Sequence, residues 1–221
     1  MVYHDFERLV STPRMVKYLR ACGNNTRKAM VLYRANMRLS NEMFSILCLF
    51  EVALRNSIDA HYRGRLGNNW LFDAAHPGGF LHAIGCEKSL EGVKKGIANL
   101  GGSYTPDKAI AELTFGFWTY QFASKEFAAA GSTLLNILPG RPFGTNHTKV
   151  FKKLAGIIRI RNRIAHHEPI CFAPTGSIST VYATQKYNQV LEVLQWLGIN
   201  VQSFLFGVDG FQREKQYIDN L

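Results

Sequence analysis

The chain has few of the features that mark membrane, exported or zinc-binding proteins. No stretch of it approaches the run of about 18 apolar residues that spans a membrane. Residues 1–7 contain neither the basic nor the apolar region of an export signal. The cysteines are scattered without Cys-x-x-Cys spacing, and they are Cys22, Cys48, Cys86 and Cys171. We therefore expect a cytoplasmic protein with reduced thiols, no membrane contact, no metal site and no cofactor.

Acidic residues are also scarce. Asp and Glu together number 16 against 26 Lys and Arg, which gives a formal net charge of +10. A basic surface attracts polyanions and speeds their capture. RNA is the partner we expect, although a basic protein without a polyanionic partner remains an alternative.

Period-2 alternation of apolar residues, the mark of a half-buried strand, is absent, and helical periodicity recurs along most of the chain. We predict an all-α protein, an irregular multi-helix bundle of about eight helices. The expected helices cover about residues 14–22, 26–37, 40–63, 89–100, 106–122, 125–138, 147–168 and 179–197, with a last helix or turn at 201–206. Without an internal repeat or a convincing linker, residues 1–221 are predicted to form a single domain.

Three of these helices have clear N-cap signals. Residues 24–26 read Asn-Asn-Thr, Thr105 precedes Pro106, and residues 145–146 read Thr-Asn. Side chains of these types accept hydrogen bonds from the first free N–H groups of a helix, and proline is favoured at its first position. The starts of these helices are therefore predicted more firmly than their ends.

Residues 158–169 read IRIRNRIAHHEP, an unusual mixture for the end of a helix, which we expect to stop at Pro169. On a helical wheel of about 100° per residue, the apolar residues of this helix share one side. They are Val150, Leu154, Ile157, Ile158, Ile164 and Ala165. Arg161 falls near the middle of this stripe. A buried guanidinium needs a partner, because an unpaired buried charge is costly.

The neighbours of Arg161 fall on other faces of the same helix. Asn162 and His166 are four residues apart, so they share one edge of the stripe. Arg163 and His167 fall on the side that faces water. The helix end is therefore predicted to present different groups to an interface, a cleft and solvent.

A second misplaced charge lies in the helix predicted for residues 40–63. Glu51 falls inside its apolar stripe, and Arg55 falls at the edge of that stripe. Either Glu51 pairs with Arg161, or Glu51 pairs with Arg55 and leaves Arg161 free for a ligand. Both arrangements satisfy the buried charges.

The residue types at the helix end suit metal-independent cleavage of RNA. The guanidinium of Arg161 can hold a phosphate and offset charge in the transition state. The imidazole of His166 can take the proton of a ribose 2′-hydroxyl, which then attacks its own phosphate to leave a 2′,3′-cyclic end. Asn162 can orient the imidazole or the phosphate. The alternatives are a structural salt bridge for Arg161 and, for His166, an imidazole stabilised by the helix dipole, a role that suits His167 better.

Arg161 and His166 do not converge within one helix. They are five residues apart, which corresponds to about 140° of rotation and roughly 7.5 Å of rise. A two-fold dimer with this helix near the axis brings copies from both chains into one cleft. We therefore expect a homodimer.

The sequence of residues 161–168, RNRIAHHE, closely resembles the Arg-polar-x-x-x-His signature of the HEPN superfamily. More narrowly, the chain resembles the Abi-like, abortive-infection family. Three further stretches carry the resemblance in the family's order: residues 32–40 (LYRANMRLS), 50–56 (FEVALRN) and 113–118 (LTFGFW). The Arg-x-x-x-x-His spacing alone is weak, but the set is more specific and covers roughly residues 30 to 170.

The resemblance implies an all-helical dimer with a metal-independent endoribonuclease centre used in bacterial defence against phage. It makes Arg161 and His166 catalytic and Asn162 the polar residue of the motif. The residues with supporting or RNA-binding roles are Glu51, Arg55, His167 and Arg163. An unidentified inhibitor or trigger is expected to restrain such an enzyme. The alternatives are a non-catalytic RNA-binding or dimerising domain and a binder of small nucleotides.

Overall fold

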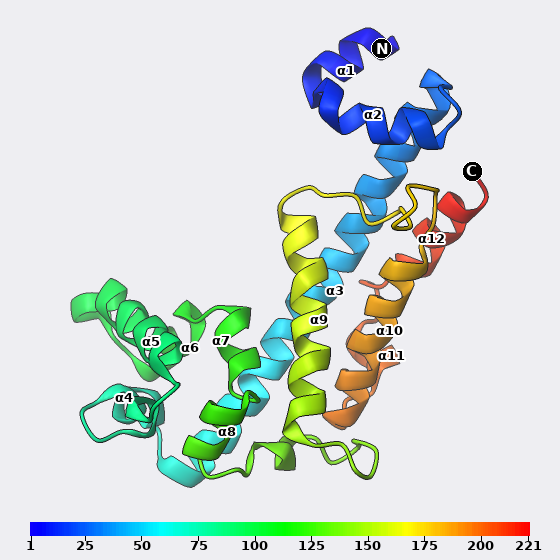
Figure 1. Cartoon of the computed structure of the whole chain (residues 1–221). Coiled ribbons are helices and arrows are strands. Elements are labelled where there is room, and N and C mark those ends of the chain that lie inside the picture. Colours follow the sequence, from blue (N-terminus) through cyan, green and yellow to red (C-terminus); the bar gives the residue numbers. More distant parts are fainter. The chain divides into compact units, whose positions relative to one another are not determined.

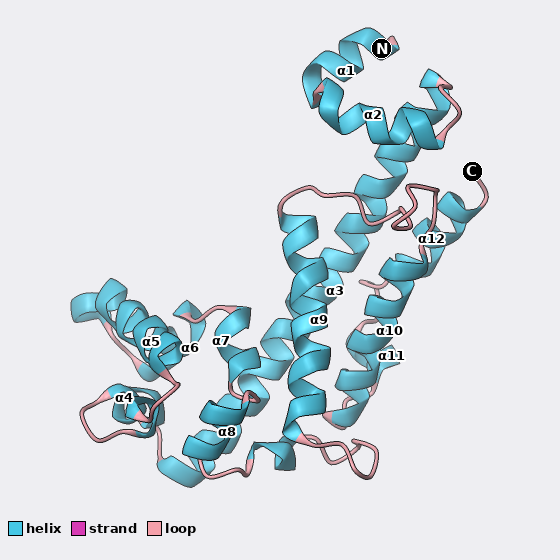
Figure 2. Cartoon of the chain, in the orientation of Figure 1, coloured by secondary structure: helices cyan, strands magenta, loops and turns pink.

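The computed structural model describes all 221 residues, and the protein is helical throughout (Figure 1). It has α-helices α1 Tyr3–Val10, α2 Thr12–Ala21, α3 Thr26–Leu66, α4 Trp70–Ala75, α5 Glu87–Leu100, α6 Pro106–Glu112, α7 Phe115–Tyr120, α8 Ser124–Ala129, α9 His147–Ala165, α10 Val181–Trp196, α11 Val201–Phe204 and α12 Phe211–Asp219. Short 3-10 helices lie at Phe80–His82, Gly101–Ser103 and Leu134–Ile137. Figure 2 shows helices and loops only, and one isolated bridge joins Phe172 and Ile178. The predicted all-α class is confirmed.

The chain divides into two compact units. Unit 1 contains Met1–Cys48, Arg159–Val190 and Gln202–Leu221, and unit 2 contains Leu49–Ile158 and Leu191–Val201. Four helices, α3, α9, α10 and α11, contribute residues to both units. The division does not follow a linker, and the single domain stays a prediction.

The core of unit 1 is built on the first part of α3. Its buried side chains recur every three or four residues, as in a helix that buries one face. They are Ala29, Leu32, Ala35, Leu39, Met43 and Ile46. Tyr18 of α2 packs edge-on against Tyr33 and Phe172, with ring centroids 5.2 and 5.0 Å apart. These contacts join α2, α3 and the segment after α9 in one apolar core, and each edge-on pair adds about 0.5–1.5 kcal/mol beyond its buried area.

Polar contacts hold α12 on the same part of α3. Arg38 donates from Nε to Glu214 at 2.8 Å, and the Glu42 carboxylate accepts the backbone N–H of Gly210 at 2.9 Å. Phe211 stacks on Tyr187 of α10, with ring centroids 4.3 Å apart. No helix was predicted at the polar end of the chain, yet α12 forms there and buries Phe211 in the core.

Unit 2 packs the second part of α3 against short helices. Phe50 meets Phe115 of α7 with ring centroids 5.8 Å apart, and Tyr62 meets Trp70 of α4 at 4.6 Å. The residues at 67–85, where no helix was predicted, contain α4 and the 3-10 turn at Phe80–His82. Buried aromatic side chains such as Trp70 stabilise this segment, although its glycines interrupt the helical periodicity of its apolar residues.

Two predicted helices are a single one. We expected helices at about 26–37 and 40–63, but α3 is continuous over 41 residues. Ser40, which resembles an N-cap in the sequence, is buried between the buried residues Leu39 and Met43. Because the apolar repeat passes through Ser40, the helix continues.

Two other predicted helices are broken. The number of α-helices rises from about eight to twelve because α1, α4 and α12 were not predicted and the helix or turn expected at 201–206 is α11. Between α6 and α7, Leu113 is extended, and the Thr114 hydroxyl caps α7 by accepting the Phe117 N–H. After α8, Gly131 and Ser132 have φ of +88° and +57°. A right-handed helix cannot pass through such backbone.

The predicted N-caps of α3, α6 and α9 are confirmed. The side chains of Asn25, Thr105 and Asn146 accept backbone N–H groups three residues later, at 2.9, 3.2 and 3.0 Å. These local signals place the helix starts correctly. The caps also set the register of α9, which carries the candidate site at its other end.

Candidate functional site

The candidate site lies at the C-terminal end of α9, within unit 1. The helix ends at Ala165, four residues before Pro169. His167 has φ of +56°, its N–H donates to the carbonyl of Ile164 at 2.9 Å, and the N–H of Glu168 donates to that of Arg163 at 2.8 Å. This is a Schellman turn with histidine where glycine is usual. The left-handed residue, and not the proline as predicted, ends the helix.

The side chain of Arg163 stabilises this turn. Its Nη2 donates to the carbonyl of Pro169 at 2.9 Å, and its Nε lies 3.5 Å from the Glu168 carboxylate without hydrogen-bond geometry. The guanidinium also lies over the ring of Tyr182, 5.6 Å from its centroid. The prediction that Arg163 faces water is right only in part, because the side chain is 38% exposed while its guanidinium also satisfies the turn.

Arg14 of α2 holds the other side of the turn. Its Nη1 donates to the carbonyl oxygen of His167 at 2.9 Å. That carbonyl has no partner in the helix, as is usual at a helix C-terminus. A cation is thereby fixed beside both histidines.

A pocket of about 310 Å³ opens between α2 and this turn, which we call the basic pocket. Its lining includes Arg14, Lys17, Tyr18, Tyr33, His166 and His167. Burial raises the pKa of Tyr18, so its hydroxyl stays neutral. The pocket therefore combines two cations, two phenols and two imidazoles with one carboxylate, that of Glu168. Because the cations outnumber the carboxylate, the pocket suits an anionic ligand.

The cationic side of α2 continues beyond the basic pocket. A shallow hollow of about 680 Å³ shares Lys17 with the pocket and adds Arg20 and the turn at 175–177. Arg14, Lys17 and Arg20 recur every three residues, so they lie along one side of α2. This set was not predicted from the sequence, although its three-residue spacing is visible there.

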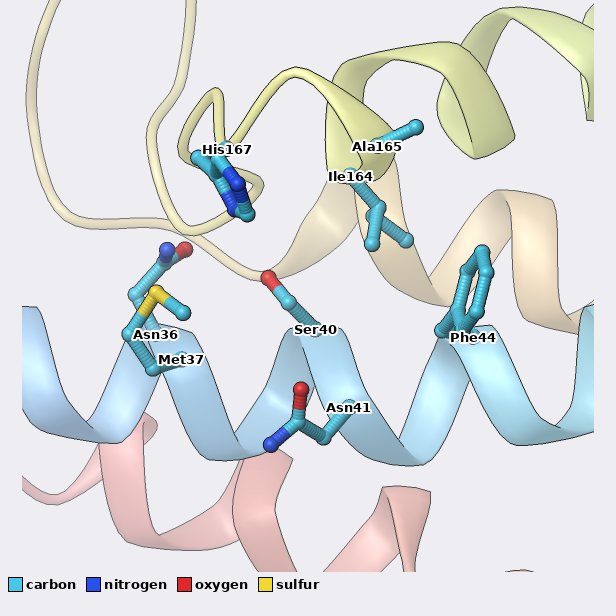
Figure 3. A pocket seen from close by; sticks show the side chains of 8 residues that line it. All are labelled: Asn36, Met37, Ser40, Asn41, Phe44, Ile164, Ala165 and His167. Carbon is cyan, nitrogen blue, oxygen red and sulfur yellow. The ribbon is translucent and has the colours of Figure 1, made fainter.

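A second pocket, of about 380 Å³, lies on the other side of His167, between the turn and α3; we call it the α3 pocket (Figure 3). Its lining includes Asn36, Ser40, Phe44, Ile164, Ala165 and His167. His167 thus lines both pockets. The sequence did not reveal this pocket, because α3 and the turn are far apart in the chain.

The structure brings only some of the predicted catalytic residues together. His166 is exposed and lines the basic pocket, whereas Arg161 lines neither pocket. The Nη1 of Arg161 donates to the Asn162 Oδ1 at the long distance of 3.5 Å. Asn162 and His166 are joined through the backbone, by the His166 N–H and the Asn162 carbonyl at 2.9 Å, and no side-chain bond links them.

The wheel prediction for Arg161 needs correction. The buried residues of α9 in the apolar stripe are Val150, Leu154, Ile157, Ile160 and Ile164. Ile160 takes the core position predicted for Arg161, and Arg161 itself is half-buried. Of the other residues predicted for the stripe, Ile158 is half-buried and Ala165 is exposed. The buried face is rotated by about 40° from the face expected, and Val150, Leu154, Ile157 and Ile164 stay on it. The guanidinium is therefore less desolvated than the sequence suggested.

The predicted charged pair on α3 lies in the other unit. Glu51 and Arg55 are half-buried residues of unit 2, and Arg55 donates from Nε to Asn56 at 3.4 Å. The pairing of Glu51 with Arg161 stays a prediction, and so do the supporting roles of Glu51 and Arg55.

Comparison of the chain with protein-family models, with curated proteins and with solved structures finds no match in any of the three. None of the helices combines the length and the apolar composition needed to cross a membrane. No three His, Cys, Asp or Glu side chains gather as metal ligands would. Fold and site define an all-helical protein with a basic, histidine-lined pocket at a helix end.

Proposed function

We propose that this protein is a metal-independent endoribonuclease of a bacterial abortive-infection system, of the Abi-like HEPN type. The observation that carries the proposal is the position of His166, an exposed imidazole that lines a pocket with Arg14 and Lys17. An imidazole can exchange protons near neutral pH, and neighbouring cations can bind the RNA phosphate. The net charge of +10 favours RNA as the polyanion.

In the proposed reaction His166 takes the proton of a ribose 2′-hydroxyl. The 2′-oxygen attacks the adjacent phosphorus, and the bond from phosphorus to the 5′-oxygen breaks. The protonated His166 then returns the proton to the leaving 5′-oxygen, which gives a 2′,3′-cyclic phosphate and a 5′-hydroxyl. Arg161 offsets the charge that builds on the phosphate oxygens, and Asn162 positions Arg161, since the two side chains already meet.

We further propose that Arg161 reaches the basic pocket from a second copy of the chain. Within one chain Arg161 lines neither pocket, so its role in the reaction needs a two-fold partner. The dimer acts in the cytoplasm under the control of an inhibitor or trigger, because unrestrained cleavage of host RNA is toxic.

A direct test uses single-stranded RNA in the presence of a chelator. Wild type should yield 2′,3′-cyclic ends, and His166→Ala and Arg161→Ala should each lose at least about 100-fold in rate. Arg159→Ala is the matched control, because Arg159 is an exposed cation on the same helix. RNA left intact by wild type at high concentration, or equal cutting by His166→Ala, would refute the nuclease.

The composite site has its own test. Mixing His166→Ala with Arg161→Ala chains gives mixed dimers in which one site has both residues. If subunits exchange freely, half of the dimers are mixed, and about a quarter of wild-type activity should return. A mixture that stays inactive while sedimentation shows dimers would place both residues in one chain.

The second candidate is a non-catalytic RNA-binding domain. The observation that favours it is the row of Arg14, Lys17 and Arg20, which suffices for phosphate binding without proton transfer. Tight RNA binding by wild type without any cleavage would support this function over the first.

A further inference from the structure

The α3 pocket has a polar floor and apolar walls. Asn36 is 2% exposed and Ser40 is 6% exposed, yet both line the pocket. Met37, Phe44 and Ile164 contribute apolar surface. Figure 3 shows the Ser40 hydroxyl and the Phe44 ring rising from α3 toward the segment that carries Ile164 and His167.

The orientation of the Asn36 amide is defined by a backbone contact. Its Oδ1 accepts the N–H of Ile170 at 2.9 Å, so its Nδ2 is the end left to donate. No protein group accepts from this Nδ2, and none bonds the Ser40 hydroxyl. Neither atom is among the fully buried polar atoms without a partner, so both are open to the pocket, where an acceptor on a ligand can bond them.

We propose that the α3 pocket binds the base of an RNA nucleotide next to the scissile phosphate. This inference rests on the proposed function, and it adds a base site to the phosphate site. A nucleobase has flat apolar faces and an edge of carbonyl and ring-nitrogen acceptors. Phe44 contacts a face, and Asn36 Nδ2 and the Ser40 hydroxyl donate to the edge.

The location of the pocket agrees with this occupant. His167 lines both the α3 pocket and the basic pocket, so a base in one and a phosphate in the other belong to neighbouring parts of one strand. The volume of about 380 Å³ lies in the range of about 300–1,000 Å³ that is typical of small-ligand pockets.

The test measures binding of the four 5′-mononucleotides to the full chain by saturation-transfer NMR. Base protons should receive saturation, and ribose 5-phosphate, which lacks the base, should bind about tenfold more weakly. Phe44→Leu should weaken nucleotide binding about fivefold to tenfold, and Ser40→Ala about fivefold. Neither change should affect ribose 5-phosphate.

Matched controls use residues outside the pocket. Ser45 is an exposed serine on α3 whose hydroxyl donates to the Asn41 carbonyl, and Phe143 is a fully exposed phenylalanine. Ser45→Ala and Phe143→Leu should bind nucleotides as wild type does. Circular dichroism checks that each variant is folded, so that lost binding is read only from folded protein.

The outcomes separate the inference from the proposed function. Equal binding of nucleotides and ribose 5-phosphate would overturn the base site even if RNA is cleaved. Phe44→Leu that changes the oligomeric state but not nucleotide binding would also overturn it, in favour of a contact between copies. Base binding in a protein that never cleaves RNA would support the base site and refute the nuclease.

Discussion

The Nη1 of Arg14 lies 2.9 Å from the carbonyl oxygen of His167 and donates a hydrogen bond to it. The two residues are 153 positions apart in the chain. This bond connects α2 to the left-handed residue that ends α9, and it lies where the two pockets meet. The geometry of the candidate site therefore depends on a helix that precedes the motif by most of the chain.

The first prediction separates the two roles of Arg14. Arg14→Ala should lower the free energy of unfolding by about 1 kcal/mol, because the His167 carbonyl loses its donor. It should also weaken RNA binding. The plot of the logarithm of the RNA association constant against the logarithm of the salt concentration should become less steep by about 1. Arg14→Lys should restore the slope but not the stability, since the shorter cation keeps only the charge.

Urea unfolding and RNA binding at several salt concentrations measure both effects. Arg27→Ala, which removes an exposed cation at the start of α3, is the control. If Arg14→Ala behaves as Arg27→Ala does in both assays, the contact does not organise the site.

The second prediction concerns strain at His167. Glycine adopts φ near +56° without the steric penalty that a side chain adds, so His167→Gly should stabilise the protein by about 0.5–1 kcal/mol. His166 has ordinary backbone, so His166→Gly should destabilise it by about the same amount. Thermal unfolding of the two variants should therefore shift in opposite directions. A lower melting temperature for His167→Gly would mean that its imidazole stabilises the turn.

The third prediction follows from the pair that holds α12. The hydrogen bond from Arg38 lowers the pKa of Glu214 below its ordinary value. The stabilisation is present above the pKa of the unfolded carboxyl and is lost as pH falls through the lower, folded pKa. Glu214→Gln should cost about 1–2 kcal/mol near pH 7, less than a fully buried pair because Arg38 is half-exposed.

Chemical unfolding at a series of pH values tests this sign. The difference between wild type and Glu214→Gln should start to shrink below about pH 4.3, the ordinary pKa of a glutamate, and should vanish only below the lower, folded pKa of Glu214, where both side chains are neutral. Glu91→Gln, at an exposed position in unit 2, should show little difference at any pH. A cost that grows in acid would contradict the pairing.

The fourth prediction concerns thiol reactivity. Cys48 is exposed, whereas Cys22, Cys86 and Cys171 are buried, and burial raises the pKa of Cys171 to about 12. Alkylation needs the thiolate and access to it. Iodoacetamide at about pH 8 should therefore add one group to the native protein, at Cys48, and four after unfolding. Rapid labelling of Cys171 in the native state would show that the core of unit 1 opens easily.

Much of the fold can be predicted from the sequence because helices are local. The caps at Asn25, Thr105 and Asn146 were predicted from two or three neighbouring residues, and the structure has all three. The boundary at Ser40 was wrong, because a buried serine inside a long helix has the same local sequence as a cap. Short helices such as α4 depend on aromatic packing, which periodicity does not report.

The candidate site was predicted less completely. His166 was singled out, and it lines a pocket. The position of Arg161 on the buried face was wrong, since an apolar stripe rotated by about 40° keeps most of the predicted residues but buries Ile160 in place of Arg161. The cations of α2 were not predicted as part of the site, because they line a pocket only when the turn after α9 packs beside α2.

The sequence by itself determined the helical class, the starts of three helices and the unusual chemistry at the end of α9. These properties follow from backbone geometry, which repeats over a few residues and can be read from their order. Only the tertiary structure decided that Arg14 and Asn36 meet the segment after α9, across 153 and 134 residues of chain. The pockets on either side of His167 exist because tertiary packing brings together residues that are far apart in the chain. No local sequence pattern encodes which residues will then face one another.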